Sequence, residues 1–185
     1  MNNKSDEEIL ELFRDKHTQS QAFSLLVKKY QERLYWQIRK IVLLHDDSDD
    51  ILQNTFVKIW KGLQNFRSDS QLFTWMFRIA TNESLTFLKE KQKKHLGYSN
   101  SEVEDMLIAN LEADAYFDGD KAQIELQRAI LQLPEKQRLV FNMKYFDDLK
   151  YDEMSEILET SVGALKASYH HAVKKIESML KLNEV

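Results

Sequence analysis

The chain has 185 residues, and its composition excludes several classes of protein. With 4 Gly and 1 Pro it is poor in the turn residues that all-β folds and phosphate-binding loops need, so helices are expected. The absence of Cys excludes a disulfide framework, a thiolate nucleophile and a cysteine-based zinc site. A formal net charge of -4 argues against binding nucleic acid by bulk electrostatics alone. The polar, acidic N-terminus and the shortness of the longest aliphatic run, Ile41 to Leu44, favour a soluble, cytoplasmic protein without direct membrane insertion.

The charge is unevenly distributed and indicates two domains. Residues 1–95 carry 16 basic and 13 acidic side chains, residues 96–120 carry 7 acidic and no basic ones, and residues 121–185 carry 10 of each. The middle segment has no sustained helical pattern and is predicted to be a linker, with at most a short helix around residues 106–111. We therefore expect an all-α protein in which two small helical domains, 1–95 and 121–185, are joined by an acidic linker.

The first domain begins with two predicted amphipathic helices. Apolar residues recur from Phe23 to Ile41 at steps of three and four, which is typical of one face of a long helix. The same spacing recurs from Leu52 to Leu63. Ser48 or Asp47 is the predicted N-cap of this second helix, because short polar side chains accept the unpaired N–H groups of a first turn.

A polar loop, residues 64–71, precedes a third predicted helix at about 72–93. One stripe of that helix mixes aromatic, basic and amide groups at steps of three, four and seven: Trp75, Arg78, Asn82 and Lys89. Such a mixture suits single-stranded DNA, since bases stack on aromatic rings and cations follow the phosphates. The alternative is a core tryptophan beside an ordinary solvated face.

The second domain carries the pattern of a helix-turn-helix. A helix at about 121–132 is followed by Pro134, which opens the next helix. Two further helices, Tyr151–Leu158 and Val162–Leu180, are separated by a three-residue turn that ends at Ser161, a good N-cap.

The outer face of the last helix is predicted to be polar and cationic. It presents Gly163, Lys166, Ala167, His170 and Lys174, with Ser168, His171 and Lys175 beside them. In a DNA-binding helix-turn-helix this helix enters the major groove, where such groups reach base edges and phosphates. The alternative is a solvated helix face. A metal site is not expected, because His170 and His171 point to different faces and no partner ligand lies at suitable spacing.

Five segments together resemble the extracytoplasmic-function (ECF) RNA polymerase sigma factors. Asp49–Trp60, Phe66–Arg67 and Phe73–Asn82 are similar to the family's polymerase-binding and −10-element segments, and Leu133–Phe141 and Tyr151–Lys166 to its −35-binding domain. The resemblance covers nearly the whole chain. It implies a non-catalytic subunit whose first domain binds RNA polymerase core and captures a non-template base, and whose second domain reads the −35 element.

The resemblance also assigns roles to individual residues. For polymerase binding it implies Asp49, Asp50, Gln53, Asn54 and Phe56. For the −10 element it implies Asn65, Phe66, Arg67, Ser68, Trp75, Arg78 and Asn82, to which the stripe adds Lys89. For the −35 element we select Lys166, Ser168, His170 and His171. The implied partners are RNA polymerase core, promoter DNA and an anti-sigma factor, with no cofactor, metal or small-molecule substrate. The linker resembles the segment that threads toward the RNA exit channel.

The sequence departs from the family at a few positions. Glu159 stands where the family often has Gly, and a left-handed residue there implies roughly 1 kcal/mol of strain or another turn shape. Ala167 and Ser168 replace the more usual Ser and Arg, and Asn54 replaces an acid. These differences bear on promoter preference more than on function.

Two other classes of function compete with a sigma factor. A stand-alone helix-turn-helix regulator would bind duplex DNA unaided, but a neutral DNA-binding domain beside an acidic linker should bind poorly alone. A helical adaptor would leave the aromatic and basic stripe without a purpose. An enzyme is not expected, because the sequence has no metal-ligand spacing, no Gly-rich phosphate loop and no nucleophile with a paired base.

Overall fold

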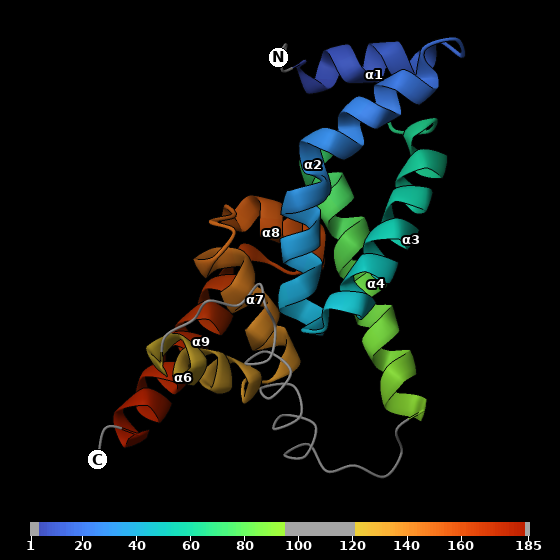
Figure 1. Ribbon diagram of the computed structural model, residues 1–185. Coiled ribbons are helices and arrows are strands. Elements are labelled where there is room, and N and C mark those ends of the chain that lie inside the picture. Colours follow the sequence, from blue (N-terminus) through green and yellow to red (C-terminus); the bar gives the residue numbers. More distant parts are fainter. Residues whose placement is uncertain (1–3, 95–120, 184–185) are drawn as a thin grey trace. The chain divides into compact units, whose positions relative to one another are not determined.

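The computed structural model describes residues 4–94 and 121–183, and all regular elements within these ranges are helices (Figure 1). This confirms the predicted all-α class. Contacts divide the chain into two units, Met1–Leu88 and Lys89–Val185. The predicted linker at 96–120, with its short helix, lies outside the described residues, so the linker and the domain boundaries remain predictions. Among the helices of the described ranges, none is long and apolar enough to cross a membrane.

The first unit is built from four helices. They are α1 (Asp6–Arg14), α2 (Gln19–Val42), α3 (His45–Leu63) and α4 (Leu72–Lys94), the last of which continues past the unit boundary. The three helices predicted from apolar periodicity are α2, α3 and α4, and the loop 64–71 lies where it was predicted. Helix α1 was not predicted.

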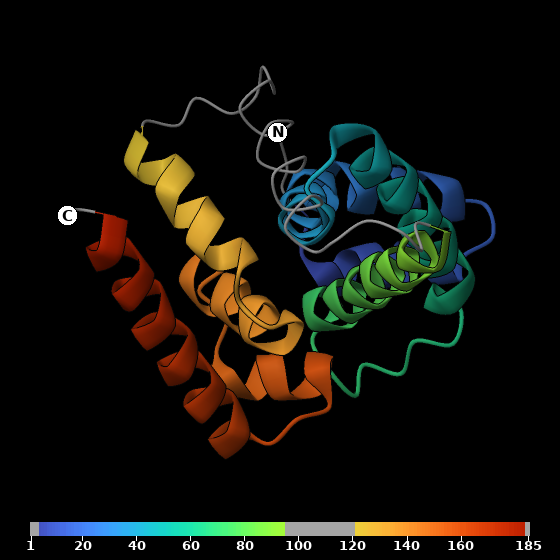
Figure 2. The same ribbon diagram turned by 90° about the horizontal axis from the view of Figure 1, so that it is seen from below.

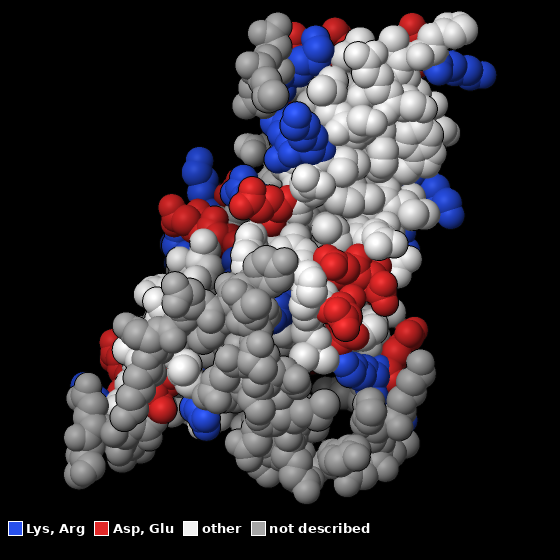
Figure 3. Space-filling model, in the orientation of Figure 1, with Lys and Arg blue, Asp and Glu red and all other residues white. Residues whose placement is uncertain are grey.

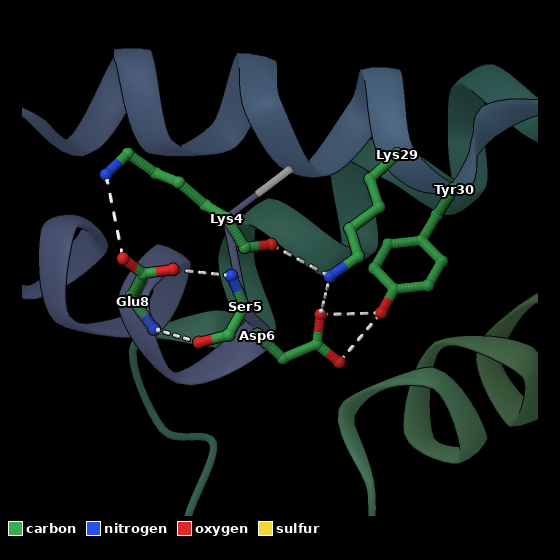
Figure 4. Close-up of polar contacts among 6 residues, drawn as sticks. All are labelled: Lys4, Ser5, Asp6, Glu8, Lys29 and Tyr30. Carbon is green, nitrogen blue, oxygen red and sulfur yellow. Dashed lines mark hydrogen bonds and ion pairs between the residues drawn. The ribbon is translucent and has the colours of Figure 1, made fainter. Parts of the chain in front are cut away.

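Helix α1 owes its start to a capping box. The Glu8 N–H donates to Ser5 Oγ at 3.2 Å, and the Ser5 N–H donates to Glu8 Oε2 at 2.6 Å (Figure 4). Asp6 then joins α1 to α2, accepting from Tyr30 Oη at 2.6 Å and from Lys29 Nζ at 2.7 Å. Burial, and then the hydrogen bond to Asp6, raise the pKa of Tyr30 above its usual range, so the phenol stays protonated as a donor.

Aromatic rings join α1, α2 and α3. The Phe13 ring of α1 meets Trp60 edge to face at 5.2 Å, and the Phe23 ring of α2 meets Trp60 at 4.9 Å. Edge-to-face pairs of this kind add to the energy of burial alone. Helices α2 and α4 are joined by a buried amide, since Gln37 Nε2 donates to the Phe77 carbonyl at 3.1 Å.

Helix α3 starts earlier than the sequence predicted. Its N-cap is Leu44, and the prediction of Ser48 or Asp47 is wrong. Leu43 adopts a left-handed conformation with φ 68°, which turns the chain so sharply that the helix begins at His45. Ser48 therefore lies inside the helix, fully buried, and its hydroxyl donates to the Leu44 carbonyl at 2.6 Å.

The second unit packs three helices against a long fourth one. They are α6 (Lys121–Leu131), α7 (Glu135–Tyr145) and α8 (Tyr151–Leu158), and α9 (Val162–Asn183) lies against all three (Figure 2). The core between α6, α7 and α9 contains Ala129, Ile130, Leu133, Phe141, Ala172 and Ile176. These helices agree with the predicted ones within a few residues.

The turn between α8 and α9 sets the angle of the helix-turn-helix. Glu159 is left-handed, with φ 51° and ψ 42°, which is the strained alternative that its resemblance to a common Gly position implied. Ser161 caps α9 by accepting from the Ala164 N–H at 3.3 Å, which agrees with its predicted role. Met154 and Leu165 are buried between the two helices and fix their crossing.

Candidate nucleic-acid interface

Acidic side chains gather where α3 begins (Figure 3). Asp46 and Asp47 lie in the first turn, and Asp49 and Asp50 follow directly. Carboxylates near the N-terminus of a helix interact favourably with the positive end of its dipole. The start of α3 is therefore stable and also presents a negative surface to solvent, on which Asp46 and Asp50 are exposed.

The residues predicted to bind polymerase lie around this surface. Asp50, Gln53 and Asn54 are exposed, whereas Asp49 and Phe56 are half-buried. The opposite side of the helix is buried in the unit through Ser48, Ile51, Thr55 and Ile59. The periodicity of α3 thus places the three exposed residues together, facing away from the core.

Asp49 and Phe56 are engaged within the unit. Asp49 Oδ2 lies 3.6 Å from His45 Nε2, and His45 Nδ1 lies 2.7 Å from Tyr35 Oη, which links the start of α3 to α2. The Phe56 ring meets Phe23 edge to face at 6.2 Å. These contacts orient Asp49 and Phe56 within the first unit.

Two exposed apolar side chains of the first unit were missed as candidates. Val57 is 51% exposed and lies one turn beyond Gln53 and Asn54, so helical spacing was a sufficient signal for it. Trp36 on α2 is 44% exposed, and no local pattern distinguishes it from the buried aromatics of the same unit. Exposed large apolar residues are typical of partner surfaces.

The loop that follows α3 is held by a glycine and a tryptophan. The Asn65 N–H donates to the Gly62 carbonyl at 3.0 Å. A Cβ on Gly62 would lie 2.7 Å from Trp75 Cζ2, so the indole packs where only a glycine leaves room. The Phe66 ring lies 5.0 Å from the Trp75 ring. The structure therefore brings Phe66 and Trp75 together, and Trp75 is half-buried rather than fully in the core.

The remaining candidates for the −10 element lie on exposed parts of the loop and α4. Arg67 and Ser68 are exposed, and Ser68 has a left-handed backbone with φ 61°. On α4, Arg78 is half-buried and Asn82 and Lys89 are exposed. The inner side of the same helix is buried through Met76, Phe77, Ala80, Thr81 and Ser84. Arg78, Asn82 and Lys89 therefore lie on the solvent-facing side of α4, in the turns that follow Trp75 and its contact with Phe66.

The candidates for the −35 element are not all on one face of α9. Lys166 and His170 are exposed and one turn apart, so they share the outer face. His171 is exposed, and at about 100° per residue it lies about 140° around the helix from Lys166 and about 100° from His170, so it does not share their face. Ser168 is half-buried and lies roughly 200° around the helix from Lys166, at about 100° per residue. Within the described ranges, no three His, Asp or Glu side chains are placed to hold a metal ion.

Comparison with known proteins identifies the family. Two family models match the chain, Sigma-70 region 2 over residues 26–94 and Sigma-70, region 4 over residues 123–176. The ECF RNA polymerase sigma factor SigW of Bacillus subtilis is 30% identical over 169 residues, covering 86% of this chain and 89% of SigW. The chain belongs to the ECF RNA polymerase sigma factors.

Other relatives of this sigma factor carry the same family name or fold. The RNA polymerase sigma-H factor of Pseudomonas aeruginosa is 28% identical over 194 residues, covering 96% of this chain and 95% of that protein. The ECF RNA polymerase sigma-E factor of Escherichia coli is 26% identical, covering 86% and 87%. Among solved structures, RpoE from Bartonella quintana in complex with the anti-sigma factor NepR has a TM-score of 0.66 at 17% identity, covering 86% of this chain and 96% of that chain. CnrH in complex with the cytosolic domain of CnrY has a TM-score of 0.68 at 21% identity, covering 97% and 99%.

Family membership decides between the functions considered from the sequence. A sigma factor binds RNA polymerase core and directs promoter recognition, strand opening and transcription initiation. The stand-alone regulator is not favoured, because both sigma regions are present in order. Sigma factors are regulators without catalytic activity of their own.

Proposed function

We propose that this sigma factor uses three separate surfaces, one for the polymerase and one for each promoter element. The exposed side of α3, with Asp50, Gln53 and Asn54, binds the polymerase core, and the half-buried Asp49 and Phe56 support it. Charge favours this role, since an exposed acidic surface is unsuited to DNA and suited to a cationic protein surface.

The loop 64–71 and α4 bind the opened −10 element. The observation that carries this assignment is the contact between the Phe66 and Trp75 rings. Arg78, Asn82 and Lys89 follow Trp75 along the solvent-facing side of the same helix. Opening one base costs a few kcal/mol, and stacking on an aromatic ring returns about 1–3 kcal/mol per base. The balance is close, so strand opening depends on the additional binding energy of the polymerase.

The outer face of α9 binds the −35 element in the major groove through Lys166 and His170, and His171 lies on the adjoining side of the helix. Ser168 contributes at most to one edge of this contact, because it lies on the other side of the helix.

The domains are 1–95 and 121–185, with 96–120 as an acidic linker that approaches the RNA exit channel. Amide substitutions of the acids between 102 and 118 should weaken initiation or promoter escape, and unchanged transcription would contradict this role of the linker.

An anti-sigma factor is the proposed regulator. One structural neighbour was solved with the anti-sigma factor NepR, and another with the cytosolic domain of CnrY. The exposed Trp36 and Val57 provide apolar surface for a protein partner. The chain carries out no catalysis itself, and it acts in the cytoplasm because RNA polymerase does.

Run-off transcription with reconstituted polymerase tests the three surfaces separately. Asp50→Lys should weaken core binding in a titration, because it reverses a charge on the proposed surface, and Glu11→Lys, at an exposed position of α1, is its matched control. Arg78→Ala should weaken binding of a non-template −10 strand, and Lys61→Ala, exposed on α3, should not. The assignment fails if the controls and the test variants behave alike.

For the −35 surface, a genomic run-off library first identifies a promoter. Lys166→Ala should then weaken holoenzyme binding to that promoter duplex and reduce the slope of log affinity against log salt by about 1, as expected for one lost phosphate contact. Lys181→Ala, exposed near the end of the same helix, is the control. An unchanged slope for Lys166→Ala would exclude this lysine from the interface.

A further inference from the structure

Tyr151, the first residue of α8, lies between two lysines of the second unit. Lys144 Nζ of α7 is 5.8 Å from the centre of the Tyr151 ring, and Lys166 Nζ of α9 is 5.6 Å from it. Both distances are within the range of about 6 Å over which an aromatic ring attracts a cation. The ring thus contacts a cation from the helix before it and a cation from the DNA-reading helix.

The first of these lysines is fixed in place. Lys144 Nζ donates to Asp148 Oδ1 at 3.0 Å and to the Leu149 carbonyl at 3.2 Å, so it spans the turn between α7 and α8. The Asp148 side chain is 92% exposed, so its carboxylate offsets part of the charge of Lys144. The pair thereby weakens the repulsion between Lys144 and a second cation at the Tyr151 ring.

The second lysine has no such anchor. Lys166 is exposed and has no carboxylate partner among the described residues, and the Tyr151 ring is the group that restrains its ammonium. A long lysine side chain loses conformational entropy when it is ordered. A side chain that is already ordered before binding loses less of that freedom when it meets a phosphate.

We propose that Tyr151 is a positioning residue for promoter recognition, which holds the ammonium of Lys166 ready for a phosphate near the −35 element. The inference rests on the proposed role of Lys166 and adds a residue of α8 that contributes through its ring. The turn between α7 and α8 is thereby connected to the recognition helix, because Lys144 contacts the Tyr151 ring and that ring contacts Lys166.

The test is a double-mutant cycle on the reconstituted holoenzyme, with a promoter duplex recovered by run-off transcription as the probe. Tyr151→Leu should lower affinity two- to five-fold, because an exposed cation–π contact is worth about 0.5–1 kcal/mol and a tenfold change about 1.4 kcal/mol. Tyr151→Phe keeps the ring and should bind as the unchanged protein does. In a Lys166→Met background, Tyr151→Leu should have no further effect.

Each outcome separates the inference from the function on which it rests. If Lys166→Met leaves binding unchanged, the proposed −35 contact fails and the role of Tyr151 fails with it. If Lys166→Met weakens binding but Tyr151→Leu leaves binding unchanged or strengthens it, only the inference is overturned. An effect of Tyr151→Leu that persists in the Lys166→Met background assigns a structural role instead, and equal losses for Leu and Phe assign the effect to the hydroxyl. Circular dichroism melting of each variant shows whether the second unit is folded.

Discussion

Replacing Glu159 by glycine should stabilise the second unit. Glu159 connects α8 to α9 in a left-handed conformation, φ 51° and ψ 42°, and its side chain is exposed. A non-glycine residue in this region costs about 1–2 kcal/mol, because Cβ approaches the following carbonyl. Glycine avoids this cost but loses about 0.5–1 kcal/mol more backbone entropy on folding. The difference runs from about 0 to 1.5 kcal/mol, so the net gain expected at the middle of this range for Glu159→Gly is about 0.5–1 kcal/mol.

The distribution of tryptophan allows the two units to be followed separately. The chain has three tryptophans, Trp36, Trp60 and Trp75, and all of them lie in the first unit. Fluorescence therefore follows that unit alone, whereas far-ultraviolet circular dichroism follows both. Thermal unfolding observed by circular dichroism but not by fluorescence belongs to the second unit. There, Glu159→Gly should raise the midpoint by about 2–8 °C for a unit of this size.

A matched variant separates turn strain from a general effect of glycine. Glu156 is exposed inside α8, where the backbone is helical, and Glu156→Gly should lower stability by about 0.5–1 kcal/mol. Opposite signs for the two variants support the reasoning. If Glu159→Gly also lowers the midpoint of the second unit, the left-handed residue is not strained and the argument is refuted.

Three further predictions concern the first unit. Phe13→Ala should lower its unfolding free energy by about 3–5 kcal/mol, measured by urea and tryptophan fluorescence, because a buried ring is removed. Folding raises the pKa of Tyr30, so the phenol contributes fully to folding stability below its usual pKa of 10.0 and progressively less above it. The unchanged protein should therefore lose more stability than Tyr30→Phe when the pH is raised from about 9 to 11. Lys58→Met should cost less than about 1 kcal/mol, since the ion pair of Lys58 with Glu83 is largely exposed on the lysine side.

Each of these has a contrary result. A loss below about 1 kcal/mol for Phe13→Ala would mean that α1 is held mainly by its polar contacts. Parallel pH profiles for the unchanged protein and Tyr30→Phe would remove the phenol from the alkaline transition. A loss above about 2 kcal/mol for Lys58→Met would show that the pair is shielded from solvent in solution.

The helices were largely predictable, and the exceptions have physical reasons. Apolar steps of three and four placed α2, α3 and α4, because burial of one face dominates in long helices. Helix α1 was missed although Ser5 and Glu8 have capping-box spacing and precede Ile9 and Phe13. The cap of α3 was not predictable locally, because the left-handed Leu43 that starts the helix early is fixed by packing.

The candidate surfaces were predictable as helix faces but not as three-dimensional arrangements. Helical spacing alone indicated that Arg78, Asn82 and Lys166 face outward, and all are at least partly exposed. The contact of Trp75 with Gly62 joins two helices across a loop, and no pattern within one helix predicts it. Ser168 was grouped with Lys166 because the two are close in sequence, but they lie on different sides of α9.

The left-handed residues of this protein give it a reserve for evolutionary change. Ser68, Asp148 and Glu159 are exposed, and each occupies a different junction between helices, where glycine would be less strained. Changes at separate turns are expected to add, because they share no contacts. A lineage that acquired a destabilising substitution on its DNA-reading face could restore its stability at Glu159 without altering a helix, whereas Ser68 is a candidate DNA contact and Asp148 binds Lys144. New promoter preferences are thus accessible without a net loss of stability.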